Sequence, residues 1–317
     1  MTALRAQHHP VCYPSAPADA LAFFRTAFKL FPAKDLPPAP NTRPLTGIVT
    51  PHIDFRVSLP SYSAAFQPLL DEPLTETYLI LGVGHRSRLE WNFDRRDYLT
   101  PLGRALCDTD LVDALAEGAD SAALFSSSAH EGEHSIEFPL LWLQALHQLQ
   151  CSDDKKLKPV RFIPLLCGGL HSYIEGFVEW DDLEDFHRLS HALAAVLRKH
   201  PPGEHLRIIV SIDGCHLGPR FDHPFEASTA LLMATAGWEE KLWASVAQGD
   251  AKAFLEWMRD EGNDRYFDGV GALALLLAAG GLANQKFIIQ RTHYEQWFTE
   301  RDASAVTFSS GRVLTLG

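Results

Sequence analysis

Residues 77–85 read TYLILGVGH, a run of apolar side chains that ends in glycines and a histidine. Three other stretches have the same character: LTGIVTPH at 45–52, VRFIPLLCGG at 160–169 and LRIIVSIDGCH at 206–216. Short, continuous apolar runs of this kind predict strands that are buried on both faces of a sheet. These runs indicate an α/β fold, because apolar side chains on both faces of a sheet must be covered by helices on both sides.

Helical patterns separate these strands. ADALAFFRTAFKLF at 18–31 has helical apolar spacing, and GALALLLAAGGLA at 271–283 predicts a buried helix. Further helices are expected at 110–119, 139–150, 182–200, 238–249 and 251–258, and further strands at 286–294 and 304–316, the latter with a hairpin-like Ser-Gly. We therefore expect a single α/β domain over residues 1–317, with a mixed, mostly parallel sheet and helices on both faces. Residues 1–45, a helix followed by a Pro-rich connector, are expected to pack on it.

Composition limits the classes of partner. The 317 residues carry a net charge of −12 and no dense Lys/Arg run, which argues against nucleic acid. The longest apolar stretch is too short to span a bilayer, and the N-terminus has no apolar signal region, so we expect no membrane association. Five cysteines without a C-x-x-C pattern are typical of reduced thiols. These features predict a cytoplasmic protein.

The ends of three predicted strands carry residues capable of chemistry. His52 ends the first run, His85 ends the run at 77–85, and Asp213 and His216 end the run at 206–216. Ligands of open α/β sheets bind outside the carboxyl ends of the strands. We therefore expect these side chains to meet in one site.

HEGEH at 130–134 matches the zinc-peptidase pattern H-E-x-x-H. That motif works on a continuous helix, but here Gly132 sits at its centre and Pro139 favours a helix that begins shortly before it. We expect HEGEH to lie in a polar surface loop that precedes a helix, so the zinc-peptidase reading is not favoured.

Taken in order, the motifs resemble the Memo family (AmmeMemoRadiSam system protein B), which is related in fold to the class III extradiol dioxygenases of the LigB type. The matching stretches are HHPVCYPSAPADALAFF, TPHIDFRVS, LILGVGHRS, YLTPLG with Asp108, EHSIEFPLLWL, RFIPLLCGG and SIDGCHLGPRF. The resemblance implies that His52 and His85 bind a metal. It also implies that His134, His216 and Asp213 line the same pocket as catalytic residues, and that His130 is incidental.

This chain departs from the Memo pattern in three stretches. Asp268, in YFDGVGALALLL, falls where the family has a cysteine of the site. Gly214 replaces an aromatic residue, and Ile53-Asp54-Phe55 replaces Ala-Gly-Tyr. A divergent member need not keep the family's function.

Two imidazoles and the Asp268 carboxylate would form the facial triad of non-haem Fe(II) oxygenases, with Zn, Cu and Mn as alternative metals. Under this hypothesis His216 or His134 acts as acid or base, and Asp213 or Asp54 orients a histidine. Asp268 could instead only cap the helix that follows it. The rival functions are a non-catalytic metal- or partner-binding module and a zinc-dependent hydrolase. The small-molecule substrate is not named by the sequence, and a protein partner remains open.

Overall fold

The computed structural model describes residues 4–5, 9, 11–38, 44–87, 89–119, 124–151 and 157–315. Its described strands form one sheet in the order β1-β5-β6-β7-β3-β8-β2-β11-β10, with β4 beside β7 and β9 beside β11. The strands are β1 (Leu4–Arg5), β2 (Leu45–Thr50), β3 (Thr77–Val83), β4 (Trp91–Phe93), β5 (Asp97–Thr100), β6 (Gly103–Cys107), β7 (Arg161–Cys167), β8 (Leu206–Ser211), β9 (His216–Leu217), β10 (Phe287–Thr299) and β11 (Ser304–Thr315).

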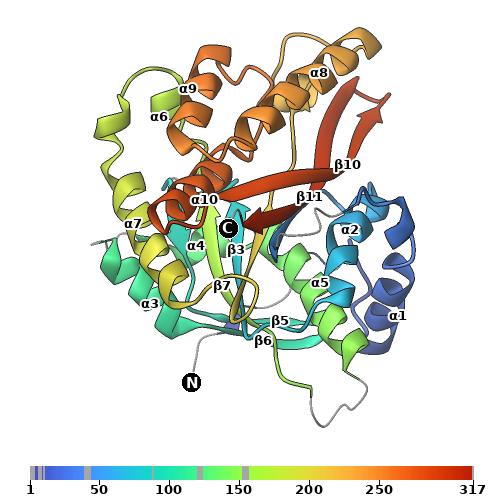
Figure 1. Ribbon diagram of the computed structural model, residues 1–317. Helices are drawn as coiled ribbons and strands as arrows, with labels where there is room; N and C mark the ends of the chain where they lie inside the picture. The colour runs from blue at the N-terminus through green and yellow to red at the C-terminus, as the bar shows by residue number, and fades with distance from the viewer. Residues whose placement is uncertain are drawn as a thin grey trace.

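The described helices cover both faces of this sheet. They are α1 (Pro17–Ala27), α2 (Leu59–Phe66), α3 (Thr109–Gly118), α4 (Ser127–His130), α5 (His134–Gln150), α6 (His171–Ile174), α7 (Glu184–Lys199), α8 (Thr229–Val246), α9 (Ala251–Glu261) and α10 (Val270–Leu282), with 3₁₀ turns η1 (Ala33–Asp35), η2 (Gln67–Asp71), η5 (Trp180–Asp182) and η6 (Pro219–Phe221). Helices α2 and α5 lie on one face with α1 outside them, and α3, α7 and α10 lie on the other (Figure 1). The predicted α/β class is therefore confirmed.

The centre of the sheet is parallel. Strands β6, β7, β3, β8 and β2 run side by side in the same direction, and in register Leu79 of β3 lies between Ile163 of β7 and Ile208 of β8. Every residue of β3 and of β8 is buried, as continuous aliphatic runs require when helices cover both faces. The carboxyl ends of β2, β3 and β8, where the predicted site residues follow, therefore lie at one edge.

Aromatic packing fixes the N-terminal helix on the sheet. Phe24 and Phe28 of α1 contact the ring of Trp142 in α5, with ring centroids 5.3 and 4.7 Å apart. Tyr62 and Phe66 of α2 stack on the same indole. Large aromatic rings that are fully buried dominate the energetics of such a contact, so these rings hold α1 against α5. Part of the predicted connector, residues 39–43, lies outside the described residues.

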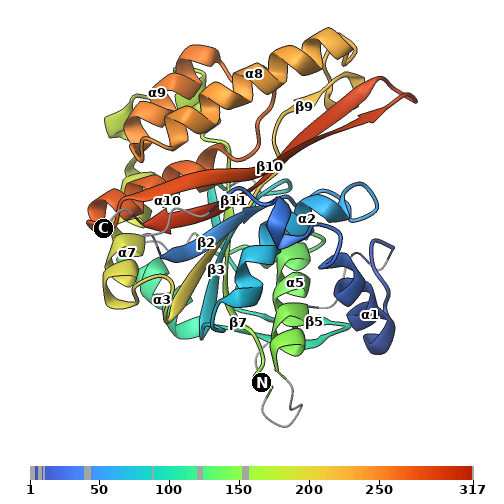
Figure 2. The same ribbon diagram turned by 45° about the vertical axis from the view of Figure 1, so that its right-hand side comes forward.

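The C-terminal strands differ from the prediction in one detail. Ser310-Gly311 was expected to form a hairpin turn, but both residues lie inside the continuous strand β11. The turn lies between Thr299 and Ser304 instead, and β10 carries a register shift between Arg291 and His293 opposite the glycine. Figure 2 shows this long hairpin passing under α8 and α9. A glycine inside a strand often marks such a bulge.

Helix α10 is apolar around nearly its whole circumference and is buried over most of its length, as predicted. Among the described residues, no helix combines the length and apolar character that crossing a membrane requires.

Candidate metal centre

Three strand ends converge as expected. His52 follows β2, His85 follows β3 and Asp213 follows β8, and the rings of the two histidines lie 5.0 Å apart at 88°. Asp213 Oδ1 accepts the backbone N–H groups of His52 and Ile53 at 2.9 and 3.1 Å. The carboxylate thus fixes the backbone on which His52 stands.

His52 and Asp268 face each other with atoms that need a cation between them. The Nδ1–H group of His52 donates to the carbonyl of Ser211 at 3.1 Å, which leaves a lone pair on Nε2 when the ring is neutral. Nε2 lies 3.2 Å from Asp268 Oδ2, yet neither atom has a partner with hydrogen-bond geometry among the described residues. Buried polar atoms are rarely left in this state, so the pair fits a site for a proton or a metal ion.

The N-cap alternative for Asp268 is wrong. Helix α10 begins at Val270, its N-cap residue is Gly269, and no side chain caps it. Asp268 makes none of the backbone bonds that a capping carboxylate would accept.

Burial and charge set the protonation of this group. Burial alone would lower the pKa of His52, but the charges of Asp213 and Asp268 raise it to about 10. Burial would raise the pKa of Asp268, and the His52 imidazolium holds it below its ordinary value, whereas burial raises the pKa of Asp213. Without a metal, these charges therefore favour an imidazolium at His52 beside an ionised Asp268.

Glu133 orients His85, a role that the sequence did not reveal. Its two carboxylate oxygens lie 3.1 and 3.2 Å from His85 Nδ1, and the same carboxylate accepts the backbone N–H groups of His134 and Ser135 as the N-cap of α5. Although burial opposes ionisation, the hydrogen bond and charge of His85 hold the pKa of Glu133 well below its usual range. Histidines that bind metals commonly have such a partner on the second ring nitrogen.

Asp54, one of the two residues predicted to orient a histidine, does not do so. Its carboxylate binds the guanidinium and backbone N–H of Arg56. Asp213, the other candidate, accepts the backbone N–H group of His52. The ring of His52 is oriented instead by the hydrogen bond from its Nδ1 atom to the carbonyl of Ser211.

His134 is the first residue of α5, and α4 ends at His130. The i, i+4 geometry of a zinc-peptidase helix is therefore absent, as the sequence indicated. The expected surface loop is wrong, however, because His130 and Glu133 are both buried. His130 contacts the Tyr98 hydroxyl and the Asn92 carbonyl, each at 3.1 Å, which is a structural role.

A close approach between β3 and α5 brings His134 to the site. A Cβ atom at Gly82 would lie 2.6 Å from Ser135 Oγ, so only glycine allows the helix to begin here. The ring of His134 stacks on His85 at 5.0 Å and lies 5.1 Å from His52. Burial and the neighbouring His52 charge lower the pKa of His134 to about 3, so it is neutral near pH 7.

His216 lies beside the cluster and is held differently. Its Nδ1–H group donates to the Tyr266 carbonyl at 3.1 Å, and its backbone N–H donates to the Arg265 carbonyl at 2.8 Å. Its ring also packs against Phe221. The Nδ1 contact assigns the proton to that atom, so Nε2 of the neutral ring can accept one.

Two overlapping sets of side chains could hold a metal ion. His52, His85 and His134 form one set, and His52, Asp213 and Asp268 form the other; within each set the ligand atoms lie within 4.8 Å of one another. Imidazoles and carboxylates are the donor types that bind Fe, Mn or Zn, so the residues of both sets fit a divalent cation.

A large cavity lies at a distance from this cluster. It measures about 860 Å³ and lies at the amino-terminal ends of the parallel strands, where Thr77, Arg161 and Leu206 line it. None of the cluster residues contributes to its wall.

Fold and cluster together define a class: an α/β protein that gathers histidines and carboxylates beyond the carboxyl ends of parallel strands, in an arrangement able to hold a divalent metal. A model of the family described as Memo-like protein matches residues 5–312 of this chain. The chain belongs to the Memo-like family.

Relatives from distant organisms match over much of the chain. A MEMO1 family protein of Thermococcus onnurineus is 26% identical over 231 residues, which cover 71% of this chain and 72% of that protein. One from Thermococcus kodakarensis is 25% identical over 267 residues, 82% of this chain and 84% of that protein. One from Schizosaccharomyces pombe is 28% identical over 190 residues, 58% of this chain and 54% of that protein.

Proposed function

We propose that this protein, as a single Memo-like domain, is a non-haem Fe(II)-dependent oxidoreductase of the dioxygenase type that acts on a chelating small molecule such as a catechol. The observation that carries the proposal is the unpartnered pair of His52 Nε2 and Asp268 Oδ2 at 3.2 Å, with His85 Nε2 at 4.0 Å from the same oxygen. His52, His85 and Asp268 would hold the ion as two imidazoles and one carboxylate.

The chemistry that such an ion supplies when bound is simultaneous coordination of a diol and O₂ at its open positions. Cleavage of a catechol ring consumes one O₂ and leaves both oxygen atoms in the open-chain product, so it needs no separate electron donor. The product is therefore a measurable signature of this reaction.

The protein's own residues would position groups and move protons. Glu133 holds the Nδ1 side of His85, and Asp213 holds the backbone of His52. Nε2 of His216 would accept the proton of a diol hydroxyl, because its Nδ1 proton is committed to the Tyr266 carbonyl. His134, which is neutral, would serve as a hydrogen-bond acceptor or a further ligand and not as an acid.

A zinc-dependent hydrolase is the second candidate. The set of His52, His85 and His134 has the three-imidazole composition of catalytic zinc sites, in which a bound water becomes the nucleophile. This alternative predicts stable zinc binding without any consumption of O₂.

The first test is metal analysis of anaerobically purified protein, followed by Fe(II) or Zn(II) titration of the wild type and Asp268→Ala. We expect one iron per chain in the wild type, at least tenfold weaker binding in the variant, and O₂ uptake when catechols are added. Asp113→Ala is the matched control, because Asp113 is a partly exposed carboxylate that pairs with Arg95 away from the cluster.

Zinc in place of iron, with no O₂ uptake, would favour the hydrolase. Absence of metal in both proteins after Fe(II) is offered would refute the metal centre itself.

A further inference from the structure

Glu239 of α8 is fully buried against the back of the loop at residues 212–216, which carries Asp213 and His216. Its Oε1 atom accepts the hydroxyl of Thr307 in β11 and lies 3.3 Å from the backbone nitrogen of Cys215. Cys215 N–H also donates to Thr307 Oγ1 at 2.7 Å. A carboxyl group at this depth is costly to bury. Its contacts are with the loop that carries Asp213 and His216, and with the strand beside that loop.

The same loop is bound to β11 along its backbone. Gly214 N–H donates to the Thr307 carbonyl at 2.7 Å, and Thr307 N–H donates to the Cys215 carbonyl at 2.9 Å. Together with the two side chains, these bonds occupy the polar backbone groups on this side of the loop. A shift of the loop alone would therefore break its hydrogen bonds to Thr307 and Glu239.

No side chain fits at Gly214 in this arrangement. A Cβ atom there would lie 2.3 Å from Thr307 Oγ1 and 2.7 Å from Glu239 Oε1, both well inside contact distance. Glycine is thus required by the close approach of Glu239 and Thr307.

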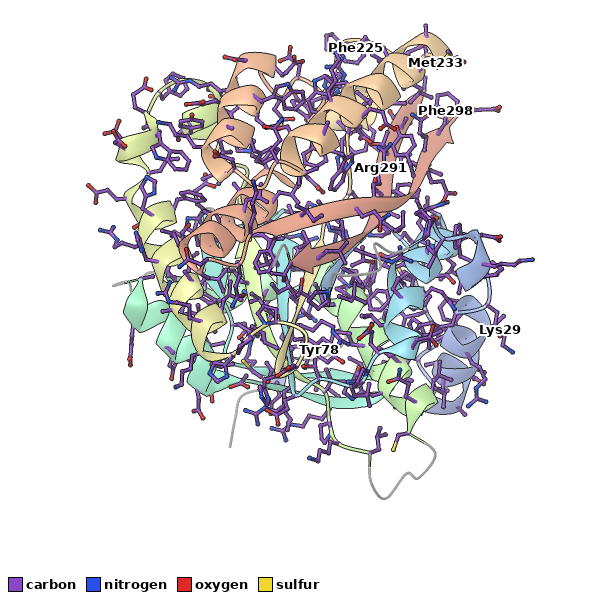
Figure 3. The ribbon with its side chains drawn as sticks, viewed as in Figure 1. Lys29, Tyr78, Phe225, Met233, Arg291 and Phe298 are labelled. Carbon is purple, nitrogen blue, oxygen red and sulfur yellow. The ribbon has the colours of Figure 1, made fainter. Side chains whose placement is uncertain are left out.

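Arg291 of β10 is a charged residue whose electrostatic effect reaches Glu239. Figure 3 shows Arg291 between α8 and the hairpin strands, where its guanidinium pairs with Glu240 and its charge acts on Glu239. Glu239 therefore lies under the charge of a β10 cation, while its contacts through Oε1 are with Thr307 and with the loop of the metal centre.

We propose that Glu239 is a positioning residue that, with Thr307, holds Asp213 and His216 at the distance from His52 and Asp268 that metal binding needs. This inference rests on the proposed metal centre. Asp213 belongs to the set with His52 and Asp268, and it lies one residue from Gly214. Loss of the contacts of Glu239 lets this strand end move, which separates the ligand atoms.

The test uses Co(II) as the probe, because its visible spectrum reports the geometry of its ligands and its titration gives an affinity. We expect Glu239→Ala to weaken Co(II) binding about tenfold or more and to change the spectrum, as loss of outer partners of metal ligands does. Glu239→Gln keeps an oxygen that accepts from Thr307 and Cys215, so its affinity should stay within about threefold of the wild type.

Glu240→Ala is the matched control, since Glu240 is the exposed neighbour of Glu239 on the same helix and also contacts Arg291. It should bind Co(II) like the wild type. Thr307→Val, which keeps the shape and loses the hydroxyl, provides a second variant in case Glu239→Ala fails to fold; it should also weaken binding. Thermal melting separates loss of fold from loss of the site.

Equal Co(II) affinity and spectrum in the wild type, in folded Glu239→Ala and in Thr307→Val would overturn the inference and leave the metal centre standing. Failure of the wild type itself to bind Co(II) or Fe(II) would refute the metal centre and this inference together.

Discussion

The Nε2 atom of His52 lies 3.2 Å from Oδ2 of Asp268, although one residue follows a central strand and the other precedes the helix α10. When the imidazole is neutral, both atoms carry lone pairs that face each other in a buried place, which is unfavourable unless a cation lies between them. In the metal-free protein the two carboxylates raise the pKa of His52 to about 10, so the imidazole holds a second proton and supplies the positive charge. Metal binding must displace this proton.

Asp268→Cys should change which metals the protein prefers. A thiolate is a softer ligand than a carboxylate, so binding of Zn(II) should strengthen relative to Fe(II) by about tenfold or more. Competition titrations of the two metals under anaerobic conditions measure this ratio. Asp268→Asn, which keeps the shape and loses the charge, should weaken both metals; unchanged affinity in that variant would show that Asp268 is not a ligand.

Glu133→Gln should separate two roles of one side chain. The amide oxygen can still accept the N–H groups of His134 and Ser135, so the cap of α5 is retained and the melting temperature should change little. Its charge on His85 is lost, and metal affinity should fall about 10- to 100-fold.

Glu133→Ala serves as the comparison, because it should lose the cap as well, at a cost of about 1–2 kcal/mol in unfolding free energy. Equal metal affinity in the wild type and Glu133→Gln would contradict a positioning role.

His130→Ala tests the assignment of HEGEH. His130 is buried, and its ring joins the Tyr98 hydroxyl to the Asn92 carbonyl. Removing it leaves both partners unsatisfied, so the free energy of unfolding should fall by about 2 kcal/mol or more. Metal affinity of the folded variant should equal that of the wild type. A selective loss of metal, measured on protein of normal melting temperature, would revive a site built on the H-E-x-x-H pair.

The fold and the strand-end histidines could be predicted because their signals are local. The apolar run before His85 indicates a buried strand, and the residue after a parallel strand lies at the ligand-binding edge whatever the rest of the chain does. His52 and Asp213 follow the same rule. Asp268 was assigned by resemblance, and local sequence left it open, since an aspartate before a helix is also a good cap.

The remaining parts of the site depend on contacts between distant segments. The sequence places Glu133 in a loop, and nothing near it in sequence shows that its carboxylate meets His85. Gly214 departs from the family pattern, but the need for glycine there comes from Thr307 of β11 and Glu239 of α8, which no local pattern connects to it. His130 appeared polar and therefore exposed, whereas Tyr98 and Asn92 supply the buried partners that make its position acceptable.

Glu137→Gln should lower stability in a way that depends on pH. Glu137 in the first turn of α5 binds the Arg5 guanidinium at 2.6 Å, the His9 backbone N–H at 3.2 Å and the Tyr13 hydroxyl, and so ties the N-terminal segment to the helix. Burial opposes ionisation, but the His9 and Tyr13 hydrogen bonds and the Arg5 charge hold the pKa at about 2, below the ordinary 4.5.

Because its pKa is lower in the folded protein, the Glu137 carboxylate contributes to the free energy of unfolding above pH 4.5. This contribution is lost as the pH falls toward 2. The difference between these values corresponds to about 3 kcal/mol at neutral pH. Denaturant unfolding of wild type and Glu137→Gln should therefore differ by that order at pH 7 and converge as the pH is lowered from 4.5 toward 2. Glu117→Gln, at an exposed position of α3, is the matched control for the substitution itself. A difference that stays constant from pH 7 to 3 would mean that the charge of Glu137 does not stabilise the fold.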